Sequence, residues 1–267
     1  MAARLLVHAG FHKTGTTSIQ KTLGHNRAAL APFAKVILRE DMEALCEAAR
    51  AFSIRPGAME RSMLIYEAAQ VFEALDPEDG RTVLMSSEDL SGHMPGRHGL
   101  TSYRAAEKIM PVLREVALEC LPGAGIGFWF TTRSRRPWLA SCYAQNVRAS
   151  RMVQSLEEFT AMIGQGADLK NQVRRIARVV APSVVGFNTL ESIADVAFGP
   201  AETLLGRAGV TIAARQRMKA VPWENRSLPP EILAEMLAIN RSDLDDRAVR
   251  DAKKTVIDRY DRQKAGA

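Results

Sequence analysis

Short apolar runs alternate with longer amphipathic stretches along most of this chain. Runs rich in β-branched and aromatic residues predict strands, and apolar residues that recur every three or four positions predict helices. Because predicted strands and helices alternate, we expect an α/β protein of three layers, a parallel sheet flanked by helices. The predicted strands are residues 4–9, 82–86, 126–132 and 183–187; the predicted helices are residues 15–23 (ended by Gly24), two within 40–75 split at Arg55-Pro56-Gly57, about 103–119, one from Pro137, and one from Ser155 with a capping box to Glu158.

The length and apolar content suit one folded unit. With 267 residues, of which 46% are hydrophobic, the chain can bury a full core, and residues 1–267 are interpreted as a single domain. The helical stretch 40–75 is expected as a candidate cap over a functional site. Residues 189–267 are predicted to be mainly helical, with Ser242 capping a charged final helix.

Charge and cysteine content narrow the classes of partner. The net charge of +6 and the pI near 9.4 favour an anionic ligand. No basic run with interleaved aromatic residues occurs, so no nucleic-acid partner is expected. Cys46, Cys120 and Cys142 are scattered, which predicts neither disulfides nor a metal site. Without a signal-peptide pattern or a run of membrane-span length, we expect a cytoplasmic protein with no membrane partner.

A glycine loop follows the first predicted strand. Gly10 and Gly15 have the spacing of a phosphate-binding loop, which aims backbone N–H groups and the next helix N-terminus at an anion. In loops that bind ATP or GTP, a lysine directly follows the second glycine and the next Ser or Thr holds Mg²⁺. Here Lys13 lies inside the loop, and Thr16-Thr17-Ser18 follows Gly15. The loop is therefore predicted to bind phosphate without that pair, although such runs also occur as ordinary strand-to-helix turns.

A second phosphate contact is predicted after the aromatic strand 126–132. Arg133 directly follows this strand, and Ser141 lies on the next predicted helix, where both side chains could converge on one phosphate. The carboxyl ends of parallel strands meet at one edge of a sheet. We therefore expect Lys13, Glu88 and Arg133, each of which follows a predicted strand, to lie at the same edge.

These segments together resemble the bacterial branch of the sulfotransferase superfamily. The resemblance implies a P-loop nucleotide-hydrolase-like fold and the sulfuryl donor 3′-phosphoadenosine 5′-phosphosulfate (PAPS), with no metal. It rests on the loop Gly10-Phe11-His12-Lys13-Thr14-Gly15-Thr16-Thr17-Ser18-Ile19-Gln20, on Arg133 and Ser141 eight residues apart, on Tyr143 and Gln145, and on the late stretch Asn225-Arg226-Ser227-Leu228-Pro229-Pro230-Glu231.

The resemblance also implies roles for individual residues. Arg133 and Ser141 would bind the 3′-phosphate of the donor, and Lys13 would stabilise the leaving group. The sulfuryl group would pass to a hydroxyl or amine of a small-molecule or carbohydrate acceptor. The loop residues that would bind the 5′-phosphosulfate are His12, Lys13, Thr14, Gly15, Thr16, Thr17 and Ser18.

An acceptor hydroxyl needs a general base, and three residues are candidates. Glu88 takes the position of the catalytic histidine of the cytosolic members, although a glutamate there can equally hold a loop. Glu40 follows an apolar run, where other branches of the family carry a catalytic glutamate. His93 lies five residues past Glu88. His8, on the first strand, is predicted to be a hydrogen-bonded core residue.

Two features of the cytosolic members are absent from this chain. Ser18 replaces the tryptophan that lies near the adenine, so Trp129 and Trp138 are expected to serve in packing. The arginine-lysine-glycine triplet that closes the 3′-phosphate site is missing as well. Three later cations could take the place of this triplet, and each could equally be an ordinary surface charge: Arg217, Lys219 and Arg226.

Two other functions fit the same motifs. A P-loop kinase acting on a small molecule would use the loop for ATP, and a catalytically silent nucleotide-binding protein would use it for binding alone. A requirement for magnesium distinguishes the kinase from the sulfotransferase. Turnover distinguishes both enzymes from the silent protein.

Overall fold

A five-stranded parallel sheet forms the centre of the molecule, in the order β2-β3-β1-β4-β5. The structure is a computed structural model, and it describes residues 4–193, 196–221 and 228–265. The strands are β1 (Arg4–His8), β2 (Ala34–Leu38), β3 (Thr82–Ser86), β4 (Gly125–Thr132) and β5 (Val184–Thr189).

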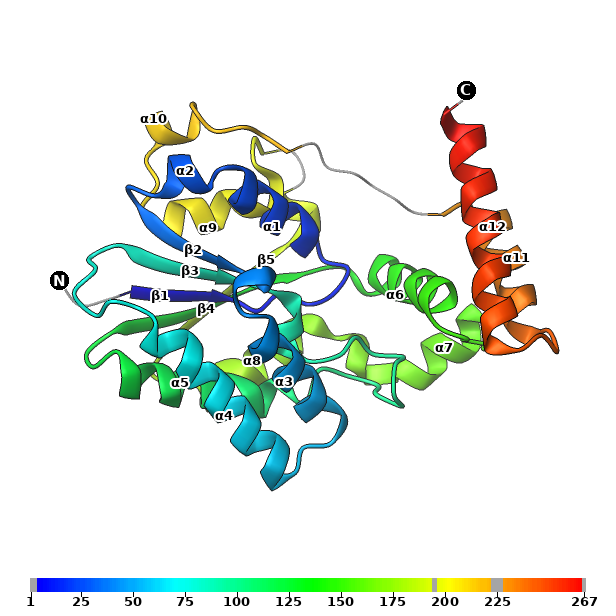
Figure 1. Cartoon of the computed structure of the whole chain (residues 1–267), viewed down its shortest axis with the longest axis horizontal. Coiled ribbons are helices and arrows are strands. Elements are labelled where there is room, and N and C mark those ends of the chain that lie inside the picture. The colour runs from blue at the N-terminus through cyan, green and yellow to red at the C-terminus, as the bar shows by residue number, and fades with distance from the viewer. Residues whose placement is uncertain (1–3, 194–195, 222–227, 266–267) are drawn as a thin grey trace.

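Helices cover both faces of the sheet (Figure 1). Successive side chains of a strand point to opposite faces, so Leu5 and Val7 of β1 enter one hydrophobic core and Leu6 enters a second. The result is a three-layer α/β fold with two cores. The first core is built with α3 (Glu43–Ile54), α4 (Ala58–Glu73), α5 (Ala106–Cys120) and α8 (Leu169–Val179); the second is built with α1 (Thr16–His25), α2 (Arg27–Leu30), α9 (Glu202–Arg207) and the neighbouring α10 (Ile212–Arg215).

The strand connections diverge beside β1. From β1 the chain passes through α1 and α2 to β2 at one edge of the sheet, whereas from β3 it passes through α5 to β4 on the other side of β1. Open parallel sheets bind ligands at the carboxyl ends of their strands, where neighbouring connections diverge. The loops that follow β1 and β3 occupy this position.

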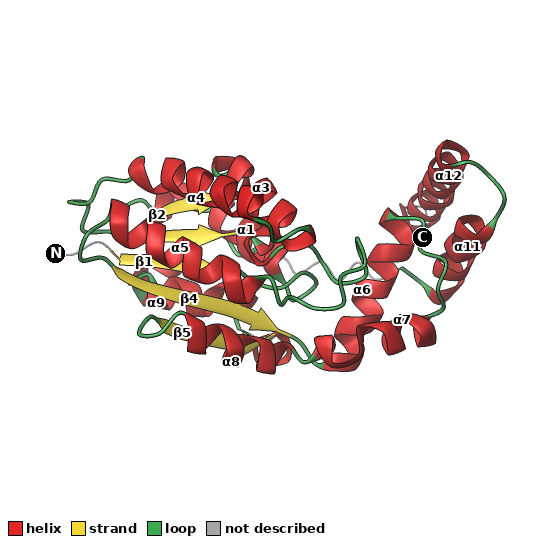
Figure 2. Ribbon diagram, turned by 90° about the horizontal axis from the view of Figure 1, so that it is seen from below, coloured by secondary structure: helices red, strands yellow, loops and turns green. Residues whose placement is uncertain are grey.

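A helical arm extends beyond the carboxyl edge of the sheet (Figure 2). It consists of α6 (Arg135–Ala149), α7 (Leu156–Ile163), α11 (Pro230–Arg241) and α12 (Asp246–Ala265). The buried Asn240 of α11 donates from its amide to the carbonyls of Val147 and Met152, both at 2.9 Å. Helix α11 is thereby fastened to α6, which itself follows β4.

Short 3₁₀ helices complete the connections. They are η1 (Arg39–Asp41), η2 (Glu88–Ser91), η3 (Gly164–Ala167), η4 (Leu190–Ile193) and η5 (Gly199–Ala201). Within the described ranges, no helix combines the length and the apolar character needed to cross a lipid bilayer.

The predicted α/β architecture with a flanked parallel sheet is confirmed, and all four predicted strands are present. The fifth strand, β2, is an addition, since its mixed segment Ala34–Leu38 lies at the sheet edge and lacks a clear strand pattern. The capping box between Ser155 and Glu158 is also confirmed. Its two hydrogen bonds measure 3.2 Å and 2.7 Å.

Two predicted helix ends are wrong. Gly24 does not end the first helix, because α1 continues through it to His25 and is followed by Asn26, whose amide donates to the Thr22 carbonyl. Ser242 does not cap the final helix: its hydroxyl donates to the Ile239 carbonyl at the end of α11. Asp245 accepts the Ala248 N–H at 2.8 Å instead, at the start of α12.

The stretch 40–75, predicted as a candidate cap, packs on a face of the sheet, and α3 also borders its carboxyl edge. Helices α3 and α4 connect β2 to β3, and their buried side chains belong to the first core. Helix α3 also reaches the edge: the Cys46 thiol of its first turn donates to the Ser87 hydroxyl at 3.4 Å, and in its last turns Arg50 lies 4.0 Å from Asp89 and Ser53 accepts the His93 N–H.

Candidate anion-binding site at the carboxyl edge

The loop between β1 and α1 has a backbone shape that requires both of its glycines. A Cβ added at Gly10 would lie 2.6 Å from the Thr16 methyl and 2.7 Å from the His8 ring. Gly15 has φ +93°, and a Cβ there would lie 2.7 Å from a Leu190 methyl. Lys13 also adopts a positive φ, of 67°. The loop is thus held in a compact conformation that an ordinary residue at either glycine would disrupt.

The loop presents a series of backbone donors. In the described part of the chain, the N–H groups of residues 13–17 donate no hydrogen bond, whereas those of Ser18 and Ile19 both bind the Gly15 carbonyl. The last two of these donors belong to the first turn of α1, where helix geometry leaves N–H groups without internal partners and the helix dipole favours an anion. Five successive donors at a helix N-terminus form a cradle suited to phosphate or sulfate.

A buried hydrogen-bond chain supports this cradle from below. The Thr14 hydroxyl donates to the Phe11 carbonyl at 2.6 Å and lies 3.0 Å from the Thr131 hydroxyl. The Thr131 hydroxyl lies 3.3 Å from Nε2 of His8, and Nδ1 of His8 lies 2.8 Å from the Ser86 hydroxyl. The Thr14 hydroxyl uses its one hydrogen on the Phe11 carbonyl, so it accepts from the Thr131 hydroxyl, which in turn accepts from His8. The proton of the His8 ring is therefore on Nε2. The chain joins the ends of β3, β1 and β4 to the loop.

His8 is therefore the hydrogen-bonded core histidine that its place on the first strand predicts. Burial lowers the pKa of His8 to about 3, so the ring is neutral at physiological pH. Thr14, which is predicted to bind the 5′-phosphosulfate of PAPS, is fully buried, and its side chain supports the loop. Its backbone N–H remains one of the cradle donors.

Lys13 lies in a predominantly cationic environment. Burial lowers the pKa of Lys13; Arg148 and Arg133 lower it further, against the opposing influence of Cys142 and Glu88. Arg133 also donates to the Lys13 carbonyl at 3.4 Å. Two half-buried cations, Lys13 and Arg133, beside unpaired N–H donors strongly attract anions. The structure thus brings Lys13, Glu88 and Arg133 to one edge of the sheet, as the sequence predicts.

Of the three candidate bases, Glu88 is the one hydrogen-bonded to α1, the helix that follows the loop. It begins η2 directly after β3, is half-buried, and accepts a hydrogen bond from Nε2 of Gln20 at 2.5 Å. Glu40 is an exposed side chain paired with Arg27 at 3.1 Å, on the edge strand side of the sheet. The sequence contains no signal for Gln20 as the residue that orients Glu88, since this contact spans 68 positions.

His93 lies in a second, histidine-containing part of the edge. Its ring centroid is 4.7 Å from that of His98. Burial lowers the pKa of His93 to about 4, and Arg50, His98, Arg97 and His12 act in the same direction. His93 is consequently neutral at physiological pH and is a weaker proton acceptor than an ordinary histidine.

His12 is held on both sides by residues that the sequence pattern does not single out. Its backbone N–H donates to the Tyr103 hydroxyl at 3.0 Å, and that hydroxyl lies 3.1 Å from Nδ1. Nε2 lies 3.5 Å from a carboxylate oxygen of Asp89. Burial would raise the pKa of Asp89, but contacts with His12 and Arg39 hold it at about 2. His12 therefore fastens the loop to its surroundings through an ionised Asp89.

The remaining predicted site residues are less constrained. Among the described residues, no side-chain hydrogen bond is formed by Thr16, Thr17, Ser18 or Ser141, and none joins Ser141 to Arg133. Trp138 is fully buried and donates from its indole to the His12 carbonyl at 3.0 Å, while Trp129 packs under Arg207, so both serve in packing as expected. Arg217 and Lys219 are exposed, and Lys219 lies beside Asn26 at the far end of α1. Arg226 and residues 225–227 of the late stretch lie outside the described residues.

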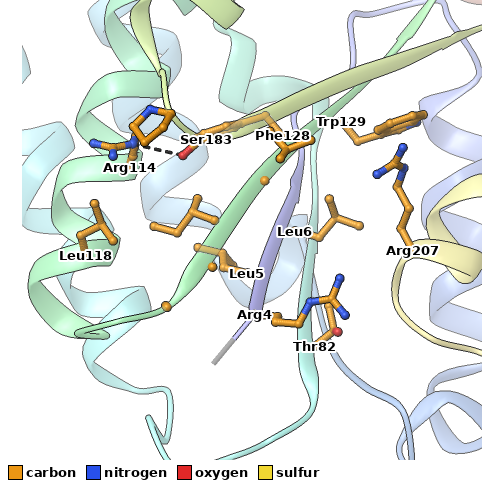
Figure 3. Close-up of a pocket in the computed structure, with 16 residues that line it drawn as sticks. Arg4, Leu5, Leu6, Thr82, Arg114, Leu118, Phe128, Trp129, Ser183 and Arg207 are labelled. Atoms are coloured by element: carbon orange, nitrogen blue, oxygen red, sulfur yellow. Dashed lines mark hydrogen bonds between the residues drawn. The ribbon is translucent and has the colours of Figure 1, made fainter. Parts of the chain in front are cut away.

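A hollow of about 450 Å³ lies at the opposite, amino edge of the sheet (Figure 3). It is lined by the first residues of β1, β3 and β4, with Arg114 bound to Ser183 at 3.1 Å on one side and Arg207 stacked on Trp129 on the other. Both arginines are thus engaged within the protein. None of the loop residues contributes to this hollow.

A matched pair of glycine substitutions tests the loop geometry. Gly15→Ala is expected to lower the free energy of unfolding by more than Gly123→Ala. Both positions have a positive φ, which costs an alanine about 1–2 kcal/mol, but a Cβ at Gly123 meets nothing within 4 Å, whereas one at Gly15 meets Leu190 and Pro200. Urea unfolding measures the difference. Equal losses in the two variants would show that Gly15 is not in close contact with Leu190.

Two comparisons with known proteins found no match. No model of a protein family matches the chain, and no curated protein matches it at a significant level.

The described residues contain no cluster of three or more histidine, cysteine, aspartate or glutamate side chains arranged to hold a metal ion.

Proposed function

We propose that this protein is a sulfotransferase that transfers a sulfuryl group from PAPS to a hydroxyl or amine of an acceptor. The observation that carries the proposal is the cradle of unpaired N–H groups at residues 13–17, with Lys13 inside it and no lysine after Gly15. Both glycines leave room that a Cβ would fill. These residues fit the 5′-phosphosulfate of PAPS, and Arg133 beside the loop provides a cation for a phosphate.

The donor supplies an activated sulfuryl group on a good leaving group, the bisphosphate 3′-phosphoadenosine 5′-phosphate (PAP). Transfer breaks the bond between sulfur and the bridging oxygen, forms a bond between sulfur and the acceptor oxygen or nitrogen, and releases one proton from the acceptor. Negative charge grows on the bridging oxygen, and the ammonium of Lys13 with the N–H groups of α1 stabilises that charge.

Glu88 takes the acceptor proton in this proposal. Its carboxylate lies within electrostatic reach of Lys13 and is oriented by Gln20. In the displacement, the acceptor atom enters on one side of the sulfur and the bridging oxygen leaves on the opposite side, so the base and the leaving-group cation must both lie at the same site. Glu40, which is exposed and paired with Arg27, and His93, whose pKa is lowered, are the alternatives.

Binding of PAP is the first test of the proposed donor. PAP is expected to raise the melting temperature in the presence of EDTA, because the cradle and its cations bind phosphate directly. Thermal-shift assays with PAP, and with ATP with and without Mg²⁺, make the comparison. A shift produced by ATP with Mg²⁺ but not by PAP would instead favour a small-molecule kinase. Binding of PAP without transfer to any acceptor in a library screened with labelled PAPS would favour a silent nucleotide-binding protein.

A further inference from the structure

A groove of about 510 Å³ lies in the helical arm, between the end of α6 and the face of α12. Its floor is apolar and includes the buried Met236 of α11 and Val249 of α12. Its walls are basic: five arginines and lysines line it, with Asp246 as the acidic member. The basic residues are Arg148, Arg151, Arg250, Lys253 and Lys254.

Two of these cations are engaged by the protein itself. Arg151 pairs with Asp246 at 2.8 Å and donates to the carbonyls of Asn240 and Ser242. Lys253 is buried, and its ammonium donates to the carbonyls of Val147 and Ser150 at the end of α6, where the helix dipole favours a cation. These two residues hold the arm together.

The other three cations remain available. Arg148, Arg250 and Lys254 are exposed and form no hydrogen bond or ion pair with any residue in the described ranges. Arg250 and Lys254 lie one turn apart on the same face of α12. Asp246, the one carboxylate among the lining residues, pairs with Arg151 and also attracts Arg250, so the groove lined by five cations keeps a net positive charge.

The groove is linked to the phosphate loop through α6. Trp138, in the first turn of α6, donates from its indole to the His12 carbonyl of the loop at 3.0 Å, and Arg148, in the last turn of the same helix, lines the groove. Arg148 also lowers the pKa of the Lys13 ammonium. Ser141, Gln145 and Arg148 recur at helical spacing, so they share one side of α6, which is at least partly open to solvent. A chain-like molecule with one end near Lys13 could therefore follow this side of the helix into the groove.

We propose that this groove binds an acidic oligosaccharide. The carboxylates or sulfates of this elongated acceptor lie along the arm, and a hydroxyl elsewhere on the same oligosaccharide lies at Lys13 and Glu88. The identification as acceptor rests on the proposed sulfotransferase function. Guanidinium groups bind carboxylate and sulfate in a bidentate manner, which suits repeated acidic groups on a chain. A nucleic acid is disfavoured because the residues that line the groove include no aromatic ring on which a base could stack.

The experiment compares two double charge reversals on α12. Arg250→Glu with Lys254→Glu alters the groove, whereas Arg247→Glu with Arg262→Glu changes the net charge equally at positions outside it. Calorimetry measures binding of a galacturonate hexamer, with neutral maltohexaose and hexathymidylate as comparison chains, and binding of PAP is measured on the same preparations. Circular dichroism verifies that the variants keep their helices.

For the groove variant, we expect the Kd of the galacturonate hexamer to rise by about tenfold or more, because charge-assisted contacts are lost. The control variant should change it by less than about twofold, and maltohexaose should bind neither variant measurably. Equal losses in both variants, or tight binding of maltohexaose, would overturn the proposal. So would tighter binding of hexathymidylate that depends on Arg250 and Lys254, which would identify the groove as a nucleic-acid site.

The measurement with PAP separates this proposal from the proposed donor. If PAP fails to bind the native protein while the hexamer still binds through Arg250 and Lys254, the groove is supported and the donor assignment fails. If PAP binds all three proteins equally and the hexamer binds none, the donor site is supported and the groove proposal fails. The binding of PAP and the binding of the hexamer therefore test the two proposals independently.

Discussion

Replacing Glu88 by glutamine is expected to lower turnover by about 10²–10⁴-fold, because this range is typical of the loss of a general base. The amide has nearly the shape of the carboxylate and can still accept the hydrogen bond from Gln20. The fold and the affinity for PAP should therefore be retained. Turnover is measured with labelled PAPS and an acceptor found by library screening, and PAP affinity is measured by calorimetry.

Glu40→Gln and His93→Asn are the matched controls for this variant. Glu40 is exposed and paired with Arg27, and His93 lies among Arg50, His98 and Arg97 with a lowered pKa, so neither change should reduce turnover by more than a few fold. Near-normal turnover in Glu88→Gln, together with an inactive Glu40→Gln or His93→Asn, would move the role of base to that residue. The donor site would be unaffected by this result.

Lys13→Ala is the second substitution with a large expected effect. We expect kcat to fall by about 10²–10³-fold, in line with the loss of one preorganised group that stabilises developing charge. The affinity for PAP should fall less, because five backbone N–H donors and Arg133 remain at the site. Single-turnover rates and PAP calorimetry on the same variant separate the two effects.

Arg133→Ala provides the contrast to Lys13→Ala. Its guanidinium is proposed to bind a phosphate of the donor rather than the reacting bond, so its removal should cost about 1.5–3 kcal/mol, mainly in donor binding. A Lys13→Ala variant that changed only the KM for PAPS would contradict the role of Lys13 in stabilising the leaving group. A loss of kcat alone in Arg133→Ala would indicate that the roles are reversed.

Much of the fold could be predicted because its signals are local. Strand β1 and the aromatic strand β4 are nearly continuous apolar runs, as expected for strands covered on both faces. Strand β2 was missed because an edge strand with Lys35 in it carries a weaker signal. The helix ends at Gly24 and Ser242 were wrong because a glycine or a serine is compatible with more than one position at a helix end.

The candidate site was predictable in part. Parallel strands bring their carboxyl ends to one edge, so the proximity of Lys13, Glu88 and Arg133 follows from strand order alone. The supports of the site do not follow from it. Tyr103 and Gln20 contact His12 and Glu88 across 91 and 68 positions, and no local pattern specifies contacts of that separation.

By itself, the sequence determined the alternation of strands and helices, the glycine loop and the position of its lysine, because backbone conformation at Gly10 and Gly15 and apolar periodicity act over a few residues. Only the tertiary structure decided that Thr14 supports the loop from below, that Glu88 bonds to α1 while Glu40 pairs with Arg27, and that α6 connects the loop to a basic groove. These relations depend on burial and on the packing of distant segments, which set the desolvation and the pairing of each charge.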